Sequence, residues 1–152
     1  MGKLDIQAKS FSELSNSELY ALLRLRAEVF VLEQECAYQD LDNYDQKAIH
    51  ICAYQGEDLV AYTRLLAPGV KYSGASIGRV VTAATVRKNG YGKEILVFSI
   101  NHSKQHWPST AITISAQEYL ENFYKELGFK TMSEPYMEDG IPHVEMTLGG
   151  SQ

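Results

Sequence analysis

Residues 87–93, with the sequence RKNGYGK, have the composition of a phosphate-binding loop. They contain two glycines and three basic residues but no acidic residue, in a chain of formal net charge −5. A β-branched run precedes them and an amphipathic helical pattern follows. A strand that turns through glycines into a helix directs several backbone N–H groups, and the positive end of the helix dipole, at one point. The segment therefore predicts a site for a phosphate or pyrophosphate.

Two common nucleotide-binding motifs are excluded by the residues of this loop. A P-loop requires glycine at the position of Arg87 and Ser or Thr at the position of Glu94. A dinucleotide-binding fingerprint requires a third glycine at the position of Ile95. The missing Ser or Thr also argues against a nucleotide hydrolase. The pattern that fits is R-x-x-G-x-G, which runs from Arg87 to Gly92.

The rest of the chain predicts the elements that must position this loop. Strands are expected at residues 3–9, 48–54, 59–66, 76–82 and 111–115, with two more around the turn at 138–140, and helices at 15–34, 90–106 and 117–127. A capping box at 15–18 begins the first helix, and Gly128 ends the last one. Hairpin strands, then β-α-β-α, then a closing hairpin predict an α/β (α+β) sheet with a parallel pair at its centre.

The composition of the 152 residues is that of a globular protein, and we expect one domain over residues 1–152. No apolar run reaches the length of a membrane span and the N-terminus lacks a signal-peptide core, so we expect a cytoplasmic protein without a membrane partner. The acidic charge argues against nucleic-acid binding. Cys36 and Cys52 match no zinc or CxxC spacing and are expected to be reduced thiols without a catalytic role.

A cluster of acidic residues lies in the segment 36–47. Asp40, Asp42 and Asp45 suggest a calcium loop, but Ile51 stands at the twelfth position, where such a loop needs glutamate. We therefore expect no metal site there, and no metal elsewhere in the chain. The expectation is an acidic, solvated loop that could attract a cationic acceptor.

A second motif follows the strand at 111–115, because residues 123–129 read FYKELGF. The R-x-x-G-x-G loop and this F-Y-x-x-x-G-F block, in this order and spacing, resemble the two signature blocks of the GCN5-related N-acetyltransferase (GNAT) family. Residues 31–40 and 139–143 resemble its ElaA-type branch. The resemblance implies a GNAT fold: a mixed, mostly antiparallel sheet of about six or seven strands with a splayed parallel pair, flanked by about four helices.

The resemblance also implies an activity, the direct transfer of an acetyl (acyl) group from acetyl-CoA, as co-substrate, to a primary amine. The acceptor would be a small molecule or a peptide. Backbone groups of residues 80–82 would polarise the thioester, the loop would hold the pyrophosphate of CoA, and Tyr124 would donate a proton to the CoA thiolate. The cofactor-binding residues that it implies are Val80, Val81, Thr82, Arg87, Lys88, Asn89, Gly90, Tyr91, Gly92, Lys93 and Gln117.

Several points stay open between alternatives. The general base could be Glu33, His50, Glu118, His143 or a water molecule. Tyr119, Phe123 and Tyr136 are expected to be core or pocket-wall residues. The alternative function is a non-catalytic acyl-CoA-binding or sensing module, which would need the glycine loop but not the hydroxyl of residue 124. Pairing through an exposed edge strand could form a homodimer.

Overall fold

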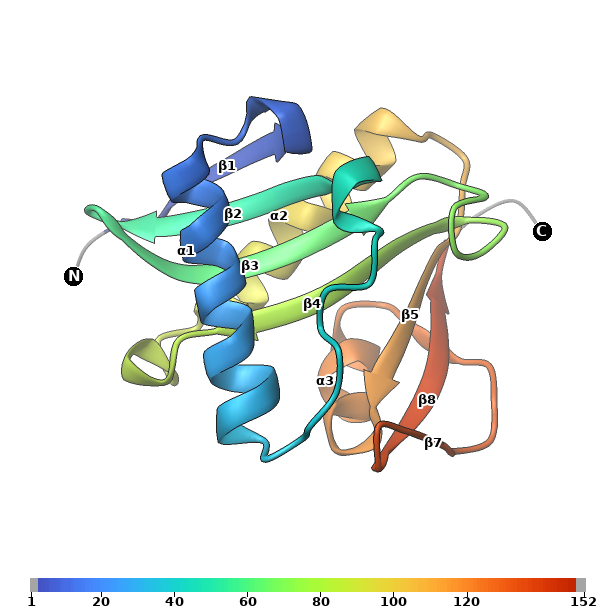
Figure 1. Cartoon of the computed structure of the whole chain (residues 1–152). Coiled ribbons are helices and arrows are strands. Elements are labelled where there is room, and N and C mark those ends of the chain that lie inside the picture. Colours follow the sequence, from blue (N-terminus) through green and yellow to red (C-terminus); the bar gives the residue numbers. More distant parts are fainter. Residues whose placement is uncertain (1–2, 150–152) are drawn as a thin grey trace.

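An open, twisted sheet of eight strands forms the centre of the molecule in the computed structural model, which describes residues 3–149 (Figure 1). Its strands are β1 (Asp5–Ser10), β2 (Ile49–Gln55), β3 (Asp58–Leu66), β4 (Ala75–Thr82), β5 (Ile112–Gln117), β6 (Lys130–Thr131), β7 (Tyr136–Glu138) and β8 (Ile141–Leu148). They lie in the order β1-β2-β3-β4-β5-β8-β6, and β7 pairs with β8. All neighbouring strands are antiparallel except β4 and β5.

The helices lie on both faces of this sheet. In Figure 1, α1 (Asn16–Arg26) lies in front of the strands and α2 (Tyr91–His106) behind them, while α3 (Glu121–Glu126) follows β5. The core behind the sheet is the larger one and contains Ile95 and Leu96 of α2 together with Tyr124 of α3. The core under α1 is smaller and packs Leu22 against Tyr62. Each helix is therefore held by an apolar stripe, as the sequence periodicity predicts.

The parallel pair β4 and β5 is joined over a short length only. Ala75 pairs with Ile112 and Ser76 pairs with Thr113, and no further pairing joins the two strands. Beyond this point β5 continues its ladder with β8 up to Gln117. The two central strands consequently diverge, and their separation leaves an opening in the middle of the sheet.

Strand β4 carries a β-bulge beside this opening. Tyr62 of β3 pairs with Val81, but Arg64 pairs with Gly78, so the register shifts by one residue between them. Arg79 lies in the bulge and has a φ of 51°, in the left-handed region. A bulge bends its strand and re-aims the local peptide groups. Because the bulge precedes residues 80–82, it changes the direction of the segment that the sequence assigns to thioester binding.

The first helix begins as the sequence predicts but continues in another form. Its capping box is confirmed: the hydroxyl oxygen of Ser15 accepts from the N–H of Glu18 at 3.0 Å, and the Glu18 carboxylate accepts from the N–H of Ser15 at 2.8 Å. From Ala27 to Glu33 the helix is a π-helix. The N–H of Gln34 donates to the carbonyl of Val29, five residues earlier, at 3.1 Å. π-Helical turns often occur at functional sites.

The α/β fold class is confirmed, with some differences in the elements. The closing segment contains three strands instead of two, the short β6 and β7 and the long β8, so the sheet has eight strands, and residues 3–149 contain three α-helices. The helix expected at 117–127 starts later, because the β5–β8 ladder extends to Gln117 and a short turn at 118–120 precedes α3. Gly128, with a φ of 104°, follows this helix as expected. No helix within residues 3–149 combines the length and apolarity that a membrane crossing needs.

Candidate active site

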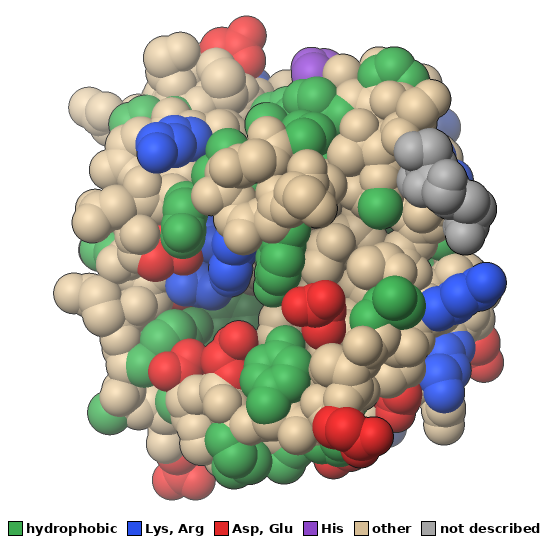
Figure 2. Space-filling model, turned by 90° about the vertical axis from the view of Figure 1, so that its right-hand side faces the viewer, with side chains coloured by type: hydrophobic (Ala, Val, Ile, Leu, Met, Phe, Trp, Pro, Cys, Tyr) green, Lys and Arg blue, Asp and Glu red, His purple; other side chains and the backbone are tan. Residues whose placement is uncertain are grey.

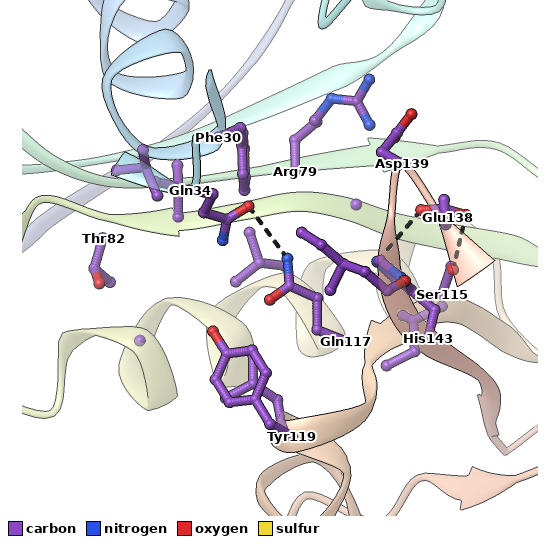
Figure 3. Close-up of a pocket in the computed structure, with 18 of the residues that line it drawn as sticks. Phe30, Gln34, Arg79, Thr82, Ser115, Gln117, Tyr119, Glu138, Asp139 and His143 are labelled. Atoms are coloured by element: carbon purple, nitrogen blue, oxygen red, sulfur yellow. Dashed lines mark hydrogen bonds and ion pairs between the residues drawn. The ribbon is translucent and has the colours of Figure 1, made fainter. Parts of the chain in front are cut away.

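A cavity of about 430 Å³ occupies the opening between β4 and β5. All residues from Ile77 to Thr82 line it, and so do parts of the π-helix, the start of α2, the segment 119–124 and the β7–β8 turn. Figure 3 shows Thr82 at one end of the cavity and Glu138, Asp139 and His143 at the other. The cavity therefore connects the glycine loop with a second, polar region.

The structure explains the two glycines of the loop in different ways. Gly90 precedes the first residue of α2 and has a φ of 79°, a conformation that disfavours side chains. Gly92 lies within the helix and lines the cavity. A Cβ at Gly92 would meet only the Cγ2 atom of Thr82, at an ordinary 3.7 Å. Since the protein does not need glycine at position 92 for its own packing, the missing side chain leaves room for a bound molecule.

Arg87 lies at the same end of the cavity and is engaged by the protein. Its guanidinium forms an ion pair with Glu33 and donates to the carbonyl of Thr82 at 3.1 Å. The hydrogen bond from Arg87 lowers the pKa of the Glu33 carboxyl. Glu33 is thus held as a carboxylate by a cation, which makes it a weaker candidate for the general base.

The predicted cofactor residues fall into three groups. Val80, Val81, Thr82 and Gln117 line the cavity with Arg87 and Gly92. Lys88, Asn89, Gly90 and Lys93 are exposed beside it and are absent from its lining. Tyr91 is buried, and its hydroxyl accepts from Nε2 of Gln55 at 2.9 Å. The side chain of Tyr91 therefore anchors the start of α2 to the sheet.

Tyr124 lies in the wall of the cavity and is almost fully buried. Its ring packs edge to face on Phe123 and Phe129. Burial, with a smaller contribution from Tyr119, raises the pKa of Tyr124 to about 12. The phenol consequently stays protonated at neutral pH and can donate a proton into the cavity.

Two glutamine side chains meet across the middle of the cavity. Nε2 of Gln117, at the end of β5, donates to Oε1 of Gln34 at 3.4 Å (Figure 3). Gln34 directly follows the π-helix, which brings it over the opening. An amide at position 117 thus reaches the space between the two central strands, where it can exchange its partner for a bound molecule.

His143 is the one candidate base whose ring lies in the described cavity. Its Nδ1 donates to the carbonyl of Ile141 at 2.7 Å, an arrangement that leaves Nε2 as the acceptor in the neutral ring. Nε2 lies 3.5 Å from a carboxylate oxygen of Glu138. The Ser115 hydroxyl donates to the other oxygen of Glu138 at 3.1 Å (Figure 3). This end of the cavity can therefore accept and hold a proton.

Two other candidate bases lie elsewhere. His50 is absent from the cavity lining and is fully buried: its Nε2 donates to the carbonyl of Asp45 at 2.9 Å and its Nδ1 accepts from the Tyr62 hydroxyl at 2.6 Å. Burial lowers the pKa of His50. Glu118 is exposed and is absent from the cavity lining. The satisfied His50 ring therefore has a structural role.

The expectation of an acidic, solvated loop at 36–47 is wrong. Three aspartates of this segment form a buried network with three arginines from α1, β3 and β4. The members are Asp40, Asp42, Asp45, Arg26, Arg64 and Arg79. Burial alone would raise the pKa of Asp42, but the hydrogen bonds and charge of Arg64 outweigh it and hold that pKa at about 2. The network neutralises the loop, so these aspartates are not available to attract a cation.

Both cysteines are free thiols, as expected. Cys52 is buried, and burial raises its pKa to about 12, so it carries little thiolate at neutral pH. Cys36 lines the cavity and its thiol donates to the carbonyl of Asp139 at 3.2 Å. This contact ties the segment after the π-helix to the β7–β8 turn.

Sequence reasoning missed four polar residues that line the cavity. They are Gln34, Arg79, Ser115 and Glu138. Glu138 had a signal, because it lies in a turn that the sequence predicts. Ser115 is one of two hydroxyl residues in its strand, with Thr113, so its type alone did not mark it. Arg79 had no such signal, because its position in the cavity depends on a β-bulge that no local sequence pattern predicts. Arg79, Ser115 and Glu138 lie at the end of the cavity opposite the glycine loop, whereas Gln34 lies in its middle.

Comparisons with known proteins agree with this arrangement. The family model of the acetyltransferase (GNAT) domain matches residues 9–149. Protein ElaA of Escherichia coli strain K12 is 42% identical over 137 residues, which are 89% of this chain and 90% of that protein. The crystal structure of Escherichia coli ElaA superposes with a TM-score of 0.91 and 38% identity, covering 96% of this chain and 99% of that one. An acyl-CoA N-acyltransferase from Pseudomonas aeruginosa gives a TM-score of 0.93 and 38% identity, covering 97% and 100%.

Proposed function

The chain belongs to the GNAT acetyltransferase family, in its ElaA-type branch, and on this premise we propose that it transfers an acetyl group from acetyl-CoA directly to a primary amine. One observation carries the proposal. The cavity between β4 and β5 joins the N-terminus of α2 to a buried phenol and a histidine. A helix N-terminus suits a pyrophosphate, a phenol suits a leaving thiolate, and an imidazole suits an ammonium.

The donor would lie along the cavity from α2 toward the bulge. Backbone N–H groups at the start of α2, with Lys88 and Lys93 nearby, would hold the pyrophosphate. The pantetheine arm would follow the exposed edge of β4 at residues 80–82 and replace Gln34 as the partner of the Gln117 amide. The bulge supports this placement because it frees peptide groups of β4 from the regular ladder.

The reaction would proceed by a single attack on the thioester. The neutral amine attacks the carbonyl carbon, and β4 N–H groups stabilise the negative charge that develops on the carbonyl oxygen. The C–S bond then breaks, and the CoA thiolate takes the proton of the Tyr124 hydroxyl. As the new C–N bond forms, the attacking nitrogen becomes positively charged and gives one of its protons to Nε2 of His143, directly or through a water molecule. The orientation of His143 by the carbonyl of Ile141 favours it over Glu33 as the base.

The substitution His143→Gln tests the base. It should lower kcat by about 100-fold or more, because general-base catalysis is usually worth 10²- to 10⁴-fold. The acetyl-CoA affinity should stay unchanged, since the ring lies at the other end of the cavity. His106→Gln is the matched control, because His106 is exposed on α2. Steady-state kinetics with one amine measures both, and unchanged turnover of His143→Gln would remove this residue from the mechanism.

A panel of amines tests the function itself. Acetyl-CoA is mixed with the protein and each amine, and the release of free CoA thiol is followed. We expect release with at least one primary amine and an N-acetylated product of matching mass. The alternative, a non-catalytic acyl-CoA-binding module, predicts saturable acetyl-CoA binding but no thiol release with any amine. That result would contradict the proposed transfer.

A further inference from the structure

A second, smaller cavity of about 60 Å³ lies beside the end of the main cavity that is remote from the glycine loop. The two share five lining residues: Ile77, Gly78, Arg79, Ser115 and Glu138. Figure 2 shows this side of the molecule, where basic and acidic side chains lie next to one another at the edge of a hollow. The small cavity is therefore a side compartment of the proposed acceptor region.

One buried donor at this compartment has no partner. Arg64 lines the small cavity and is 1% exposed. Its two terminal nitrogens donate to Asp42 and Asp45 at 2.8–3.1 Å. Its Nε is a buried side-chain atom without a hydrogen-bond partner within residues 3–149. A buried donor left unpaired costs roughly 1–3 kcal/mol, so an acceptor atom is expected beside it.

Other donors line the same compartment. Lys71, from the β3–β4 connection, and the hydroxyl of Ser76 both belong to its lining and not to that of the main cavity. No carboxylate of the described chain forms an ion pair with Lys71. Gly78 adds space, because a Cβ there would have no atom within 4 Å. The compartment thus combines a guanidinium N–H, an ammonium and a hydroxyl with unfilled space beside Gly78.

The size of the compartment limits what can occupy it. A water molecule needs roughly 10–15 Å³ of such space, so about 60 Å³ admits a few waters or one carboxylate group, but no ring. Glu138, at the boundary with the main cavity, has the opposite charge to Lys71. An anion inside and a cation at the boundary would therefore both find a partner of opposite charge.

The geometry points to an amino acid as the acceptor of the acetyl transfer proposed above, on which this inference rests. Its carboxylate would enter the small cavity and accept hydrogen bonds from Arg64 Nε, Lys71 and Ser76. Its ammonium group would lie at Glu138, near His143 and the bulge of β4. The ammonium group loses its first proton to solvent, and the neutral amine attacks the thioester. The nitrogen then gives a second proton to His143, the CoA thiolate takes the proton of Tyr124, and the product is an N-acetyl amino acid. An acceptor with cationic groups only would place positive charge against Arg64 and Lys71.

Matched pairs of acceptors test this assignment. Each pair consists of an amino acid and the amine that lacks only its carboxylate: glycine and methylamine, alanine and ethylamine, phenylalanine and phenethylamine, lysine and cadaverine. The carboxylate should raise kcat/KM by about 10- to 100-fold in at least one pair, as a charged hydrogen-bond partner does. Equal or better rates with every decarboxylated amine would overturn the assignment, leave acetyl transfer intact and assign the compartment to water.

The substitution Lys71→Met locates the effect. It removes the ammonium but keeps the length of the side chain, so it should abolish most of the preference for the carboxylate. The KM for acetyl-CoA should not change, because Lys71 does not line the main cavity. Lys104→Met, on the exposed face of α2, is the matched control and should keep the preference. A preference that survives Lys71→Met unchanged would overturn the assignment of this compartment.

A binding measurement keeps the inference testable if no acceptor releases thiol. The same pairs are titrated into the CoA-loaded protein and followed by the backbone amide resonances of residues 71–78. Larger shifts with the amino acid than with its amine, lost in Lys71→Met, would support a carboxylate site even though the proposed transfer had failed. Equal shifts within every pair would overturn the carboxylate site, whatever the activity.

Discussion

The two ends of the cavity are built in opposite ways. The end at α2 comes from one short stretch of chain and presents mainly backbone: two glycines, the helix N-terminus and the edge of β4. The other end is assembled from the side chains of Arg79, Ser115, Glu138 and His143, which lie on four strands. A ligand common to a whole family can be held by backbone groups, whereas a ligand particular to one branch needs side chains. The first end is thus suited to the donor and the second to the acceptor.

Tyr124 lines the same cavity, and the loss of its hydroxyl should have the largest effect. Tyr124→Phe should lower kcat by about 10²- to 10⁴-fold with every acceptor, because the leaving thiolate loses its proton donor. Acetyl-CoA affinity should change little, since the ring remains. Kinetics and calorimetric titration measure the two quantities. Tyr20→Phe, at an exposed position of α1, should behave as the unmodified protein. Full turnover by Tyr124→Phe would assign the proton transfer to another group.

The acceptor end depends on the buried network of arginines and aspartates, which the donor end lacks. Asp45→Asn leaves Arg26 and Arg64 without a shared anion, so the free energy of unfolding should fall by about 3–5 kcal/mol. Glu28→Gln, in the exposed pair with Arg24, should change it by less than about 0.5 kcal/mol. Urea denaturation followed by circular dichroism measures both. Similar losses in the two variants would mean that the network contributes no more than a surface pair.

Lowering the pH should also weaken the network of arginines and aspartates, with a smaller loss of folding stability than in Asp45→Asn. The pKa of Asp42 is about 2 in the folded protein, below its value in an unfolded chain, so the carboxylate stabilises the fold above about pH 4. This stability, up to about 2–3 kcal/mol, should be lost as the pH falls from about 4 to 2. Urea midpoints across this range measure it, and the slope should flatten in Asp42→Asn. An unaltered slope in that variant would trace the acid sensitivity to other carboxyls.

Two glycine substitutions compare the ends directly and should have the smallest effects. Gly92→Ala should weaken acetyl-CoA binding by about tenfold, because the new methyl group enters the donor space. Gly78→Ala should raise the KM of the acceptor more than that of acetyl-CoA. Neither should lower the free energy of unfolding, because neither Cβ meets an atom closer than 3.7 Å. Identical kinetic effects of the two variants would contradict the assignment of acetyl-CoA to one end of the cavity and the acceptor to the other.

The sequence predicted well what depends on neighbouring residues. The capping box of α1, the β2–β3 hairpin, the loop at 87–93 and the glycine after α3 each lie in a few consecutive residues, and each is confirmed as local structure. The order of these elements was enough for the fold class. The functional role of the loop remains a proposal, although its position at the start of α2 agrees with it.

What the sequence could not predict depends on distant partners. Arg26 is 14 residues from Asp40, and Arg79 is 39 residues from the same aspartate. Because the arginine partners are so distant in the sequence, the acidic cluster was predicted to be solvated, although it forms a buried ion-pair network. The bulge at Arg79 results from two strands that differ in length by one residue locally. The acceptor end consists mainly of such long-range features, which explains why the sequence identified the donor and left the acceptor open.

The π-helix at Ala27–Glu33 makes the wall of the cavity sensitive to chain length and not only to side-chain identity. Each α-helical residue turns the chain by about 100°, so the loss of one residue there, with a return to α-helical bonding, would swing Phe30 and Gln34 to another side of the helix. Insertions and deletions of single residues in this segment could therefore redraw the acceptor space in one evolutionary step. Relatives that differ in length at this helix are the first place to look for changed acceptors.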